Sequence, residues 1–393
     1  PGQRVYVPGS SGAPLAFMDA LLADPQRSAG LQLTTSYVPG INSLDIDRLA
    51  PDASLTGMFM QAGFAQAQQQ GRYRALPTSY AGFIRQIQDG PGFDLAVVQL
   101  SPPDANGRCS LGPLAEFTPA VLARSRNVLG IINPNVPTIP GAAGVALSQL
   151  DHWLEADTAL PTYGVRNDAV SEQIAAHLAG LIGDGASVQM GLGAVPNALY
   201  PALANHRRLR LHSGMLSDGL MALHATGALD PDFAPTTCAL VGSTDFYAAA
   251  AHLPGLRVLG CQYTHDPRTL LDLERFTAVN SALEVDLFGQ CNLEHANGRA
   301  VSGVGGAPDF VRAARLSPGG CSIIALPATH GRQAHSRIVA QLPAGTPASL
   351  ARCDIDCVVT EFGIAHLQGR SVHERAHALI AIAAPAHRDA LAD

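Results

Sequence analysis

The chain has 393 residues and a formal net charge of -7; 47% of its residues are hydrophobic and 15% are charged. This length corresponds to about two domains, and the high apolar fraction excludes an intrinsically disordered protein. Because the charge balance is acidic, we expect neither nucleic acid nor a membrane surface as a partner. No lysine occurs among the 25 basic residues, which excludes Schiff-base chemistry on lysine and a Walker-type phosphate site.

The seven cysteines are scattered along the chain and include no CxxC pair. This pattern argues against a disulfide framework and a zinc knuckle, so we expect reduced thiols in a cytoplasmic protein that binds no metal. The sequence also lacks a continuous apolar stretch of ~18 residues, the minimum for a membrane-spanning helix.

Short apolar runs at residues 93–100 and 127–132 are typical of buried strands in a parallel sheet, and the spacing of residues 117–126 between them predicts a helix. The stretch 157–168 carries turn residues without periodicity and predicts a domain boundary. We therefore expect two α/β domains with mostly parallel sheets, residues 1–160 and 161–393.

The same alternation continues in the second half of the chain. Residues 169–182 predict an amphipathic helix, and the segment ASVQMGLG predicts a strand that ends in a turn. Residues 196–206 resume as a helix with Pro196 in its first turn. Later strands are predicted in CSIIALP and CDIDCVVTEFG, and a closing helix in SVHERAHALIAIA.

Two glycine-rich segments are candidate sites. In residues 189–199, a strand, two glycines and a helix N-terminus present backbone N–H groups to an anion or oxyanion, or else the glycines serve only tight packing. Residues 302–310 hold three glycines in four positions, which lets the backbone approach a ligand or forms an ordinary loop. Neither segment matches the dinucleotide GxGxxG spacing.

Three further patterns have simpler interpretations. Glu284 and Asp286 alternate with apolar residues as on one face of a strand, and we interpret them as a hydrogen-bonded structural pair. The sequence HERAH at residues 373–377 matches HExxH, but no third ligand stands out, so we interpret it as a chance match on a helix. Cys353 and Cys357 lie four residues apart beside a predicted strand, and we expect both to be neutral buried thiols.

Taken together, the motifs of this chain resemble the acetyl-CoA hydrolase/transferase family, which contains the class I CoA-transferases for 4-hydroxybutyrate and succinate. The resemblance rests on seven blocks that occur in order along nearly the whole chain: SPPDANGRCSLG, MGLGAVPNAL, LHSGMLSDG, NSALEVDLFGQCN, SGVGGAPDF, CSIIALPATHG and VVTEFGIAHLQGRS.

The resemblance implies two CoA-transferase-type domains, similar to the NagB/RpiA fold, with most of the active site on the second. It implies coenzyme A as the substrate, in the form of acyl-CoA, a small acceptor or water as the second reactant, and a homodimer or homotetramer. It assigns the oxyanion hole for the thioester carbonyl to backbone groups of Leu192, Gly193, Ala194 and Gly306. It also points to Gly303, Gly305, His212 and Asp218 as substrate-binding positions.

Two departures from the family matter for the reaction. The family carries a nucleophilic glutamate where this chain has Gly214, which has no side chain. The family usually has asparagine where this chain has His265, a residue with an ordinary pKa of about 6.5 that suits general acid or base work. The alternative, of equal weight, is that His265 replaces only the hydrogen bond of the asparagine. Glu361 matches a family glutamate near the acyl or acceptor pocket and is the remaining carboxylate candidate.

We therefore expect an enzyme that acts on an acyl-CoA thioester by direct acyl transfer or hydrolysis, without a glutamyl-CoA intermediate. The alternative is ordinary CoA exchange between an acyl-CoA and a carboxylate. Enolate chemistry in the space beside Gly214, such as decarboxylation or carbon–carbon bond formation, and a non-catalytic CoA-binding role are two further alternatives.

Overall fold

The computed structural model describes residues 2–393, which form two compact units. The first unit extends to Gly164 and also takes in Pro235–Thr264 and Val301–Gly305. The second consists of Val165–Ala234, His265–Ala300 and Gly306–Asp393. The predicted boundary at residue 160 assumes two consecutive halves, but each unit also takes in segments that are distant in the sequence. Backbone hydrogen bonds join such segments within a unit, for example from Leu240 N to Pro113 O.

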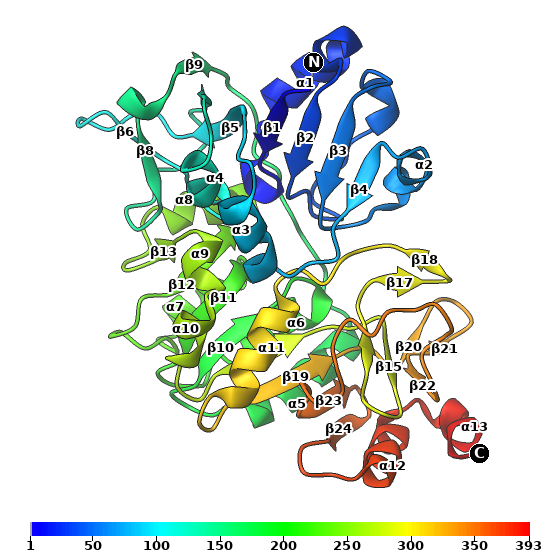
Figure 1. Cartoon of the computed structure of the whole chain (residues 1–393). Helices are drawn as coiled ribbons and strands as arrows, with labels where there is room; N and C mark the ends of the chain where they lie inside the picture. The colour runs from blue at the N-terminus through cyan, green and yellow to red at the C-terminus, as the bar shows by residue number, and fades with distance from the viewer. Residues whose placement is uncertain (1) are drawn as a thin grey trace. The chain divides into compact units, whose positions relative to one another are not determined.

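The first unit is built around a seven-stranded sheet whose pairings are parallel. The order of its strands is β4-β3-β2-β1-β5-β7-β9 (Figure 1). Their bounds are β1 Arg4–Val7, β2 Gln32–Thr35, β3 Ser54–Gly57, β4 Tyr73–Ala75, β5 Leu95–Leu100, β7 Val128–Ile132 and β9 His152–Glu155.

The other elements of the first unit are short helices and two strand pairs. The helices are α1 Leu15–Ala23, α2 Ala65–Gln69, α3 Tyr80–Asp89, α4 Thr118–Leu122, α8 Thr244–Ala250 and α9 Cys261–Thr264. The strand pairs are β6 Arg108–Ser110 with β8 Gly144–Ala146, and β12 Thr236–Leu240 with β13 Arg257–Val258.

Local sequence explains these elements. Helix α3 buries Tyr80, Phe83, Ile84 and Ile87, which recur at helical spacing, and the hydroxyl of Ser79 caps its first turn by accepting from Gly82 N at 3.3 Å. Strand β5 has hydrophobic residues on both faces and is almost wholly buried, as expected for a central parallel strand.

The second unit contains a sheet in which β11, β10, β14, β19, β23 and β24 lie in that order (Figure 1). The pairings recorded from β11 to β23 are parallel, and β24 runs antiparallel to β23. The strand bounds are β10 Ser187–Met190, β11 Arg210–Leu216, β14 Thr277–Asn280, β19 Cys321–Ala325, β23 Cys357–Thr360 and β24 Gly363–His366.

Helices and a small three-stranded sheet complete the second unit. The helices are α5 Ala169–Leu181, α6 Ala194–Ala202, α7 Gly219–Ala225, α10 Pro267–Leu271, α11 Ala307–Leu316, α12 Val372–Ile382 and α13 Arg388–Ala392. The small sheet joins β15 Glu284–Asp286 to β16 Cys291–Asn292 and β22 Ile338–Val339. Two further strand pairs form hairpins: β17 His295–Ala296 with β18 Arg299–Ala300, and β20 Thr329–His330 with β21 His335–Ser336.

The α/β class and the parallel sheets are confirmed, and the predicted strands and helices occur with shifted ends. Helix α4 is shorter than the predicted 117–126 and stops at Leu122. Helix α6 begins at Ala194, before Pro196, because a proline in the first helical turn removes no internal hydrogen bond. No helix among residues 2–393 is long and apolar enough to span a membrane.

A buried carboxyl group joins several elements of the first unit. Glu116 is fully buried and has a positive φ of 38°. Its carboxyl oxygens accept hydrogen bonds from the hydroxyls of Ser36 and Tyr80, and its carbonyl accepts from Cys261 N at 2.7 Å. Burial raises the pKa of Glu116 to about 7, against the lowering effect of these two hydroxyls.

This raised pKa predicts that the stability of the protein depends on pH. Between the ordinary value of 4.5 and about 7, the folded chain keeps a proton on Glu116 that the unfolded chain has lost. Stability therefore falls as pH rises through this window, by about 3 kcal/mol in total, and this contribution is constant above it. Urea unfolding of the parent and of Glu116→Gln at several pH values measures the effect, which the amide removes.

Exposed Glu155 on β9 supplies the matched control, since Glu155→Gln leaves the pH dependence as it is in the parent. An unchanged pH profile in Glu116→Gln contradicts the prediction.

Candidate functional site

Several predicted site residues lie at one edge of the second unit's sheet. Strand β10 ends at Met190 and leads through a glycine turn into helix α6, whose N-cap is Gly193 with a φ of +124°. That backbone conformation favours glycine. As at the start of any α-helix, the first N–H groups of α6 have no partners inside the helix. Strand β11, which carries Gly214, runs parallel to β10, so the carboxyl ends of the two strands meet at the same edge.

Ser213 holds the ends of these two strands together. Its hydroxyl is fully buried, donates to Met190 O at 2.7 Å and accepts from Met190 N at 3.3 Å. Ser213 therefore serves the structure of the edge, and its hydroxyl is engaged with the backbone rather than available as a nucleophile.

Gly214 and Gly306 face the same imidazole ring. A Cβ atom on Gly214 would lie 3.2 Å from His265 Nε2 and 3.3 Å from Phe310 Cε2. A Cβ atom on Gly306, the N-cap of α11, would lie 2.5 Å from His265 Nε2 and 3.1 Å from Phe310 Cε2. The structure thus brings together three predicted site residues, and the space beside Gly214 that we expected to admit a second substrate holds His265 and Phe310.

Phe310 was missed by the sequence analysis. Its ring lies 4.6 Å from that of His265 between centroids, and it is buried with Leu270, Phe276 and Ala314. The helical spacing of apolar residues in APDFVRAARL indicates a buried face, but not that this face contacts His265.

The environment of His265 changes its proton affinity. The side chain is only 1% exposed, and burial, with a further contribution from the charge of His212, lowers its pKa to about 3. The pKa of His265 therefore lies well below the ordinary value of about 6.5, because the charged imidazolium has lost its hydration. At neutral pH His265 is a neutral imidazole, which can accept a hydrogen bond on one nitrogen and donate from the other.

The remaining predicted positions of the second unit are less closely associated. Glu361 follows β23 and accepts a hydrogen bond from Ala328 N at 2.8 Å. Three strands, β10, β14 and β19, separate β23 from the strand of Gly214. His212 is buried in β11, and Asp218 is exposed at the N-cap of α7.

Gly303 and Gly305 pack against a neighbouring loop of the first unit. A Cβ atom on Gly303 would lie 2.1 Å from the carbonyl oxygen of Met58, and Gly305 has a φ of +56° with the Phe59 ring at 3.3 Å. Close backbone packing by itself therefore explains these two glycines, and their role in substrate binding stays a prediction.

The paired carboxylates of β15 are structural, as we interpreted them. Asp286 is fully buried and accepts from Phe288 N, Gln290 N and the Gln290 side chain at 2.7–3.1 Å. Glu284 accepts from the side chain of Asn292 at 2.9 Å. These bonds shape the turn between β15 and β16 and compensate the buried charge.

The HExxH match also has a structural explanation. Glu374 completes a capping box with Ser371 at the start of α12, and His373 and His377 face each other with 3.0 Å between their Nε2 atoms. Within residues 2–393, no third ligand joins these two histidines to make a metal-binding group.

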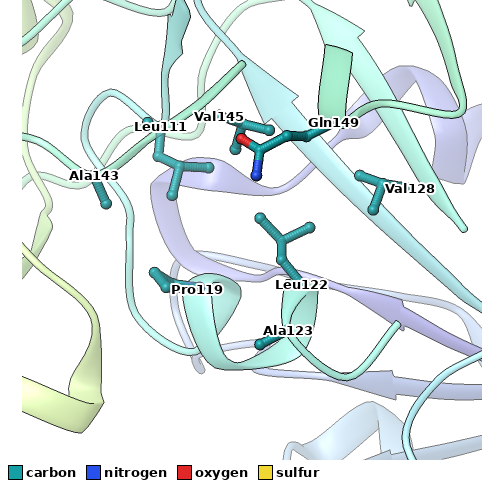
Figure 2. A pocket seen from close by; sticks show the side chains of 9 residues that line it. Leu111, Pro119, Leu122, Ala123, Val128, Ala143, Val145 and Gln149 are labelled. Carbon is teal, nitrogen blue, oxygen red and sulfur yellow. The ribbon is translucent and has the colours of Figure 1, made fainter. Parts of the chain in front are cut away.

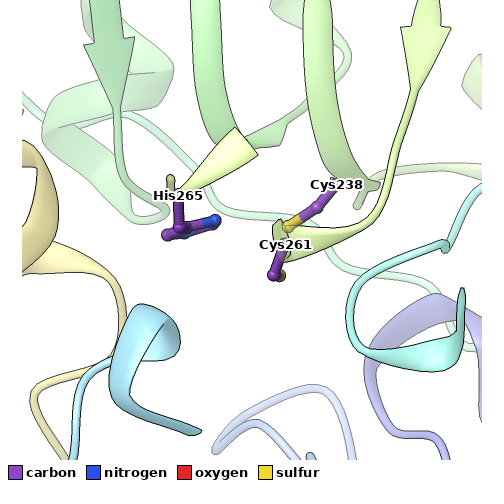
Figure 3. Close-up of side chains that lie close together, drawn as sticks. All are labelled: Cys238, Cys261 and His265. Carbon is purple, nitrogen blue, oxygen red and sulfur yellow. The ribbon is translucent and has the colours of Figure 1, made fainter. Parts of the chain in front are cut away.

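Two features of the first unit carry no predicted function. A pocket of about 330 Å³ contains no titratable side chain (Figure 2), and it is lined by Leu111, Pro119, Leu122, Ala123, Val128, Ala143, Gly144, Val145 and Gln149. The thiols of Cys238 and Cys261, drawn in Figure 3, are both buried, and burial together with the neighbouring Cys238 raises the pKa of Cys261 well above its usual range.

The close packing around His265 predicts unequal effects of two alanine substitutions. Gly306→Ala forces the buried ring to move and lowers the unfolding free energy by about 1–3 kcal/mol, whereas Gly214→Ala costs less because its contacts are longer. Urea unfolding measures both. Gly180→Ala on helix α5, where a Cβ meets nothing within 4 Å, is the control and raises stability by about 0.5–1 kcal/mol. Equal stability of the two site variants contradicts the prediction.

Comparison with known proteins agrees with this architecture. The family described as acetyl-CoA hydrolase/transferase C-terminal domain matches residues 242–393. The 4-hydroxybutyrate coenzyme A transferase of Clostridium kluyveri is 31% identical over 401 residues, which cover 99% of this chain and 92% of that protein. Among solved structures, RipA from Yersinia pestis has a TM-score of 0.91 at 27% identity, covering 100% of this chain and 93% of that chain. The 4-hydroxybutyrate CoA-transferase of Porphyromonas gingivalis has a TM-score of 0.81 at 28% identity, covering 100% and 92%.

Proposed function

The chain belongs to the acetyl-CoA hydrolase/transferase family and is a transferase or hydrolase that acts on acyl-CoA; we propose that it cleaves the thioester by direct attack of water or a small acceptor. In this proposal no glutamyl-CoA intermediate forms. The observation that carries this proposal is the packing of His265 and Phe310 against Gly214. The position that the resemblance assigns to the nucleophile has no side chain, and a neutral imidazole lies where such a side chain would begin.

The backbone groups of the site supply the charge stabilisation. Ala194 begins a helix of nine residues and Gly306 caps one of ten residues, so both helix N-termini present N–H groups and positive potential. In the proposed reaction, these groups donate hydrogen bonds to the thioester oxygen as it becomes an oxyanion. Charge that develops only in the transition state is then stabilised more than the ground state.

His265 moves the proton in this proposal. Neutral His265 accepts the proton of the attacking water or acceptor as the new bond to the carbonyl carbon forms. Its pKa of about 3 makes neutral His265 a weak base for this first transfer, and it makes the imidazolium a strong acid that gives up the proton readily to the sulfur of the departing CoA. The carbon–sulfur bond breaks, and the products are free CoA and the acid, or the acylated acceptor.

Ordinary CoA exchange is the second candidate, because several relatives are named CoA transferases, among them the butyryl-CoA:acetate CoA-transferase of Anaerostipes caccae, 31% identical over 336 residues. This reaction needs another carboxylate in the place of the missing nucleophile. The carboxylates of Glu284, Asp286 and Glu361 already accept hydrogen bonds from the protein. The proposal also includes acyl-CoA as the substrate, bound beside Gly303, Gly305, His212 and Asp218. It further includes assembly of the chain as a homodimer or homotetramer.

The experiment that separates the two candidates is mass spectrometry of the protein after incubation with acetyl-CoA or 4-hydroxybutyryl-CoA and treatment with borohydride. Direct attack predicts free CoA and no change in the mass of the protein. A CoA-linked or borohydride-reduced adduct would show a covalent carboxylate and restore CoA exchange.

His265→Ala is expected to lower the rate of CoA release by about 10²-fold, the lower end of the usual contribution of a general acid or base, because the low pKa of His265 makes it a weak base. The assay follows free thiol under saturating acyl-CoA. His373→Ala, on the exposed start of α12, is the control and leaves the rate unchanged. Full activity in the His265 variant contradicts the proposed role.

A double substitution tests the same packing in the opposite direction. Gly214→Glu alone places Cβ against the His265 ring, so we expect no covalent adduct from it. Gly214→Glu combined with His265→Asn reproduces the residues that the family resemblance assigns to both positions, and it is expected to form the borohydride-trapped adduct. An adduct in the single variant at the level of the double variant would show that His265 does not obstruct this position.

A further inference from the structure

Two cysteines and a histidine lie together at an edge of the second unit's sheet that the proposed reaction does not use. Cys321 opens β19, Cys357 opens the neighbouring β23, and His366 ends β24. The sulfur atoms of the two cysteines are 3.9 Å apart, and Cys357 Sγ lies 3.4 Å from His366 Nδ1.

The strand register explains this meeting. Cys357 pairs directly with His366 across the antiparallel β23–β24 ladder. It also pairs with Ile323 of β19, which lies two residues after Cys321 and therefore on the same face of the strand. The three side chains consequently project from one face of three adjacent strands.

A neighbouring carboxylate fixes the backbone on which the two cysteines lie. Asp356 N donates to Ser322 O at 3.0 Å, and the Asp356 carboxylate accepts from Ser322 N at 3.0 Å. Arg315 donates to the same carboxylate at 2.6 Å. Two hydrogen bonds therefore join the residues directly beside Cys321 and Cys357, and Arg315 holds the carboxylate that accepts one of them.

The two thiols differ in access and in acidity. Cys321 is partly exposed, whereas Cys357 is buried. The hydrogen bond between them lowers the pKa of Cys321 and raises the pKa of Cys357, so Cys321 is the better nucleophile for a reagent that arrives from solvent.

From this geometry we propose that Cys321 and Cys357 are a redox-active thiol pair, which a low-molecular-weight disulfide converts to an intramolecular disulfide, with His366 as the proton acceptor for Cys357. The sulfur atoms have to approach from 3.9 Å to about 2.05 Å, and because Cys321 and Cys357 are diagonal neighbours in the strand register, this approach includes a movement of the backbone.

The reaction proceeds in two exchanges. The Cys321 thiolate attacks one sulfur of the reagent, forms a mixed disulfide and releases the first small thiolate, which takes up a proton. Cys357 then loses its proton to His366 Nδ1 and attacks Cys321 Sγ, so the second small thiolate leaves and takes the proton from the imidazolium. The two protein thiols are oxidised by two electrons, and the reagent is reduced to two small thiols.

The other cysteines lack this combination of features. Cys238 and Cys261 lie close to each other (Figure 3), but both are buried, so neither presents a thiol to a reagent from solvent. Cys353 is exposed, and its thiol donates to an Asp354 oxygen at 3.7 Å rather than to a second thiol.

The pair also lies away from the site proposed for the acyl-CoA reaction. Cys321 and Cys357 occupy the amino ends of their parallel strands, and the His265 cluster adjoins the carboxyl ends of β10 and β11. The inference therefore does not depend on the proposed function, and its test uses no activity measurement.

The test treats the full, reduced chain with oxidised glutathione, blocks the remaining thiols by alkylation at successive times and maps the tryptic peptides. Because the chain has no lysine, trypsin yields the peptides 316–332 and 353–370, of which the second contains both Cys353 and Cys357. Mapping is therefore done in Cys353→Ser, which leaves one thiol in each peptide and serves as the matched control. We expect the two peptides to become joined by a disulfide.

Two variants resolve the steps. Cys357→Ser is expected to stop at a stable mixed disulfide with glutathione on Cys321. His366→Gln is expected to form that mixed disulfide at the parent rate and to resolve it at least about 10-fold more slowly.

Three results would overturn the proposal: glutathione that remains on Cys321 in the Cys353→Ser chain, glutathione found only on Cys353 in the parent, or equal resolution rates with and without His366. The first two are read in proteins with an intact thiol pair, so they stand even where a strand variant fails to fold.

Discussion

The contact of one buried imidazole with two glycines is the constraint on which the candidate site depends. His265 Nε2 lies 3.2 Å and 2.5 Å from the positions that Cβ atoms on Gly214 and Gly306 would take. Gly306 therefore cannot carry a side chain while His265 stays in place, and a side chain at Gly214 requires His265 and Phe310 to shift by a few tenths of an ångström. The same enclosure removes hydration from His265 and lowers its pKa, so the chemistry of the ring and the composition of its neighbours have one cause.

The parallel sheet of the second unit determines which residues take part in that contact. Parallel strands bring their carboxyl ends to one edge, and helices that precede or follow them place their N-termini there. Gly193, Gly214 and Gly306 belong to this edge although up to 113 residues separate them in the sequence. Ser213 joins two of these strands by two hydrogen bonds and makes the edge more rigid.

Buried polar groups have different hydrogen-bond partners in the two units. Asp286 is surrounded by three hydrogen-bond donors, which compensate a buried negative charge. Glu116 accepts from two hydroxyls only, and its pKa of about 7 means that folding favours the protonated acid. Cys321 and Cys357 share a hydrogen bond at the amino ends of their strands, where one thiol is made more acidic and the other less. Burial is the main cause of the raised pKa of Glu116, whereas the shared hydrogen bond is the main cause of the opposite pKa shifts of the two thiols.

The sequence by itself determined the α/β class, the order of strands and helices and the family, because these follow from apolar periodicity, turn residues and short motifs that are local in the chain. It also located the glycines of the site. Only the tertiary structure decided that His265 lies against Gly214 and Gly306, that Phe310 joins them, that Glu361 is three strands away and that Cys321 meets Cys357. These facts, and the low pKa of His265, depend on contacts between segments that are far apart in the chain. Spacing along the sequence does not tell which distant segments meet or how deeply their contacts are buried.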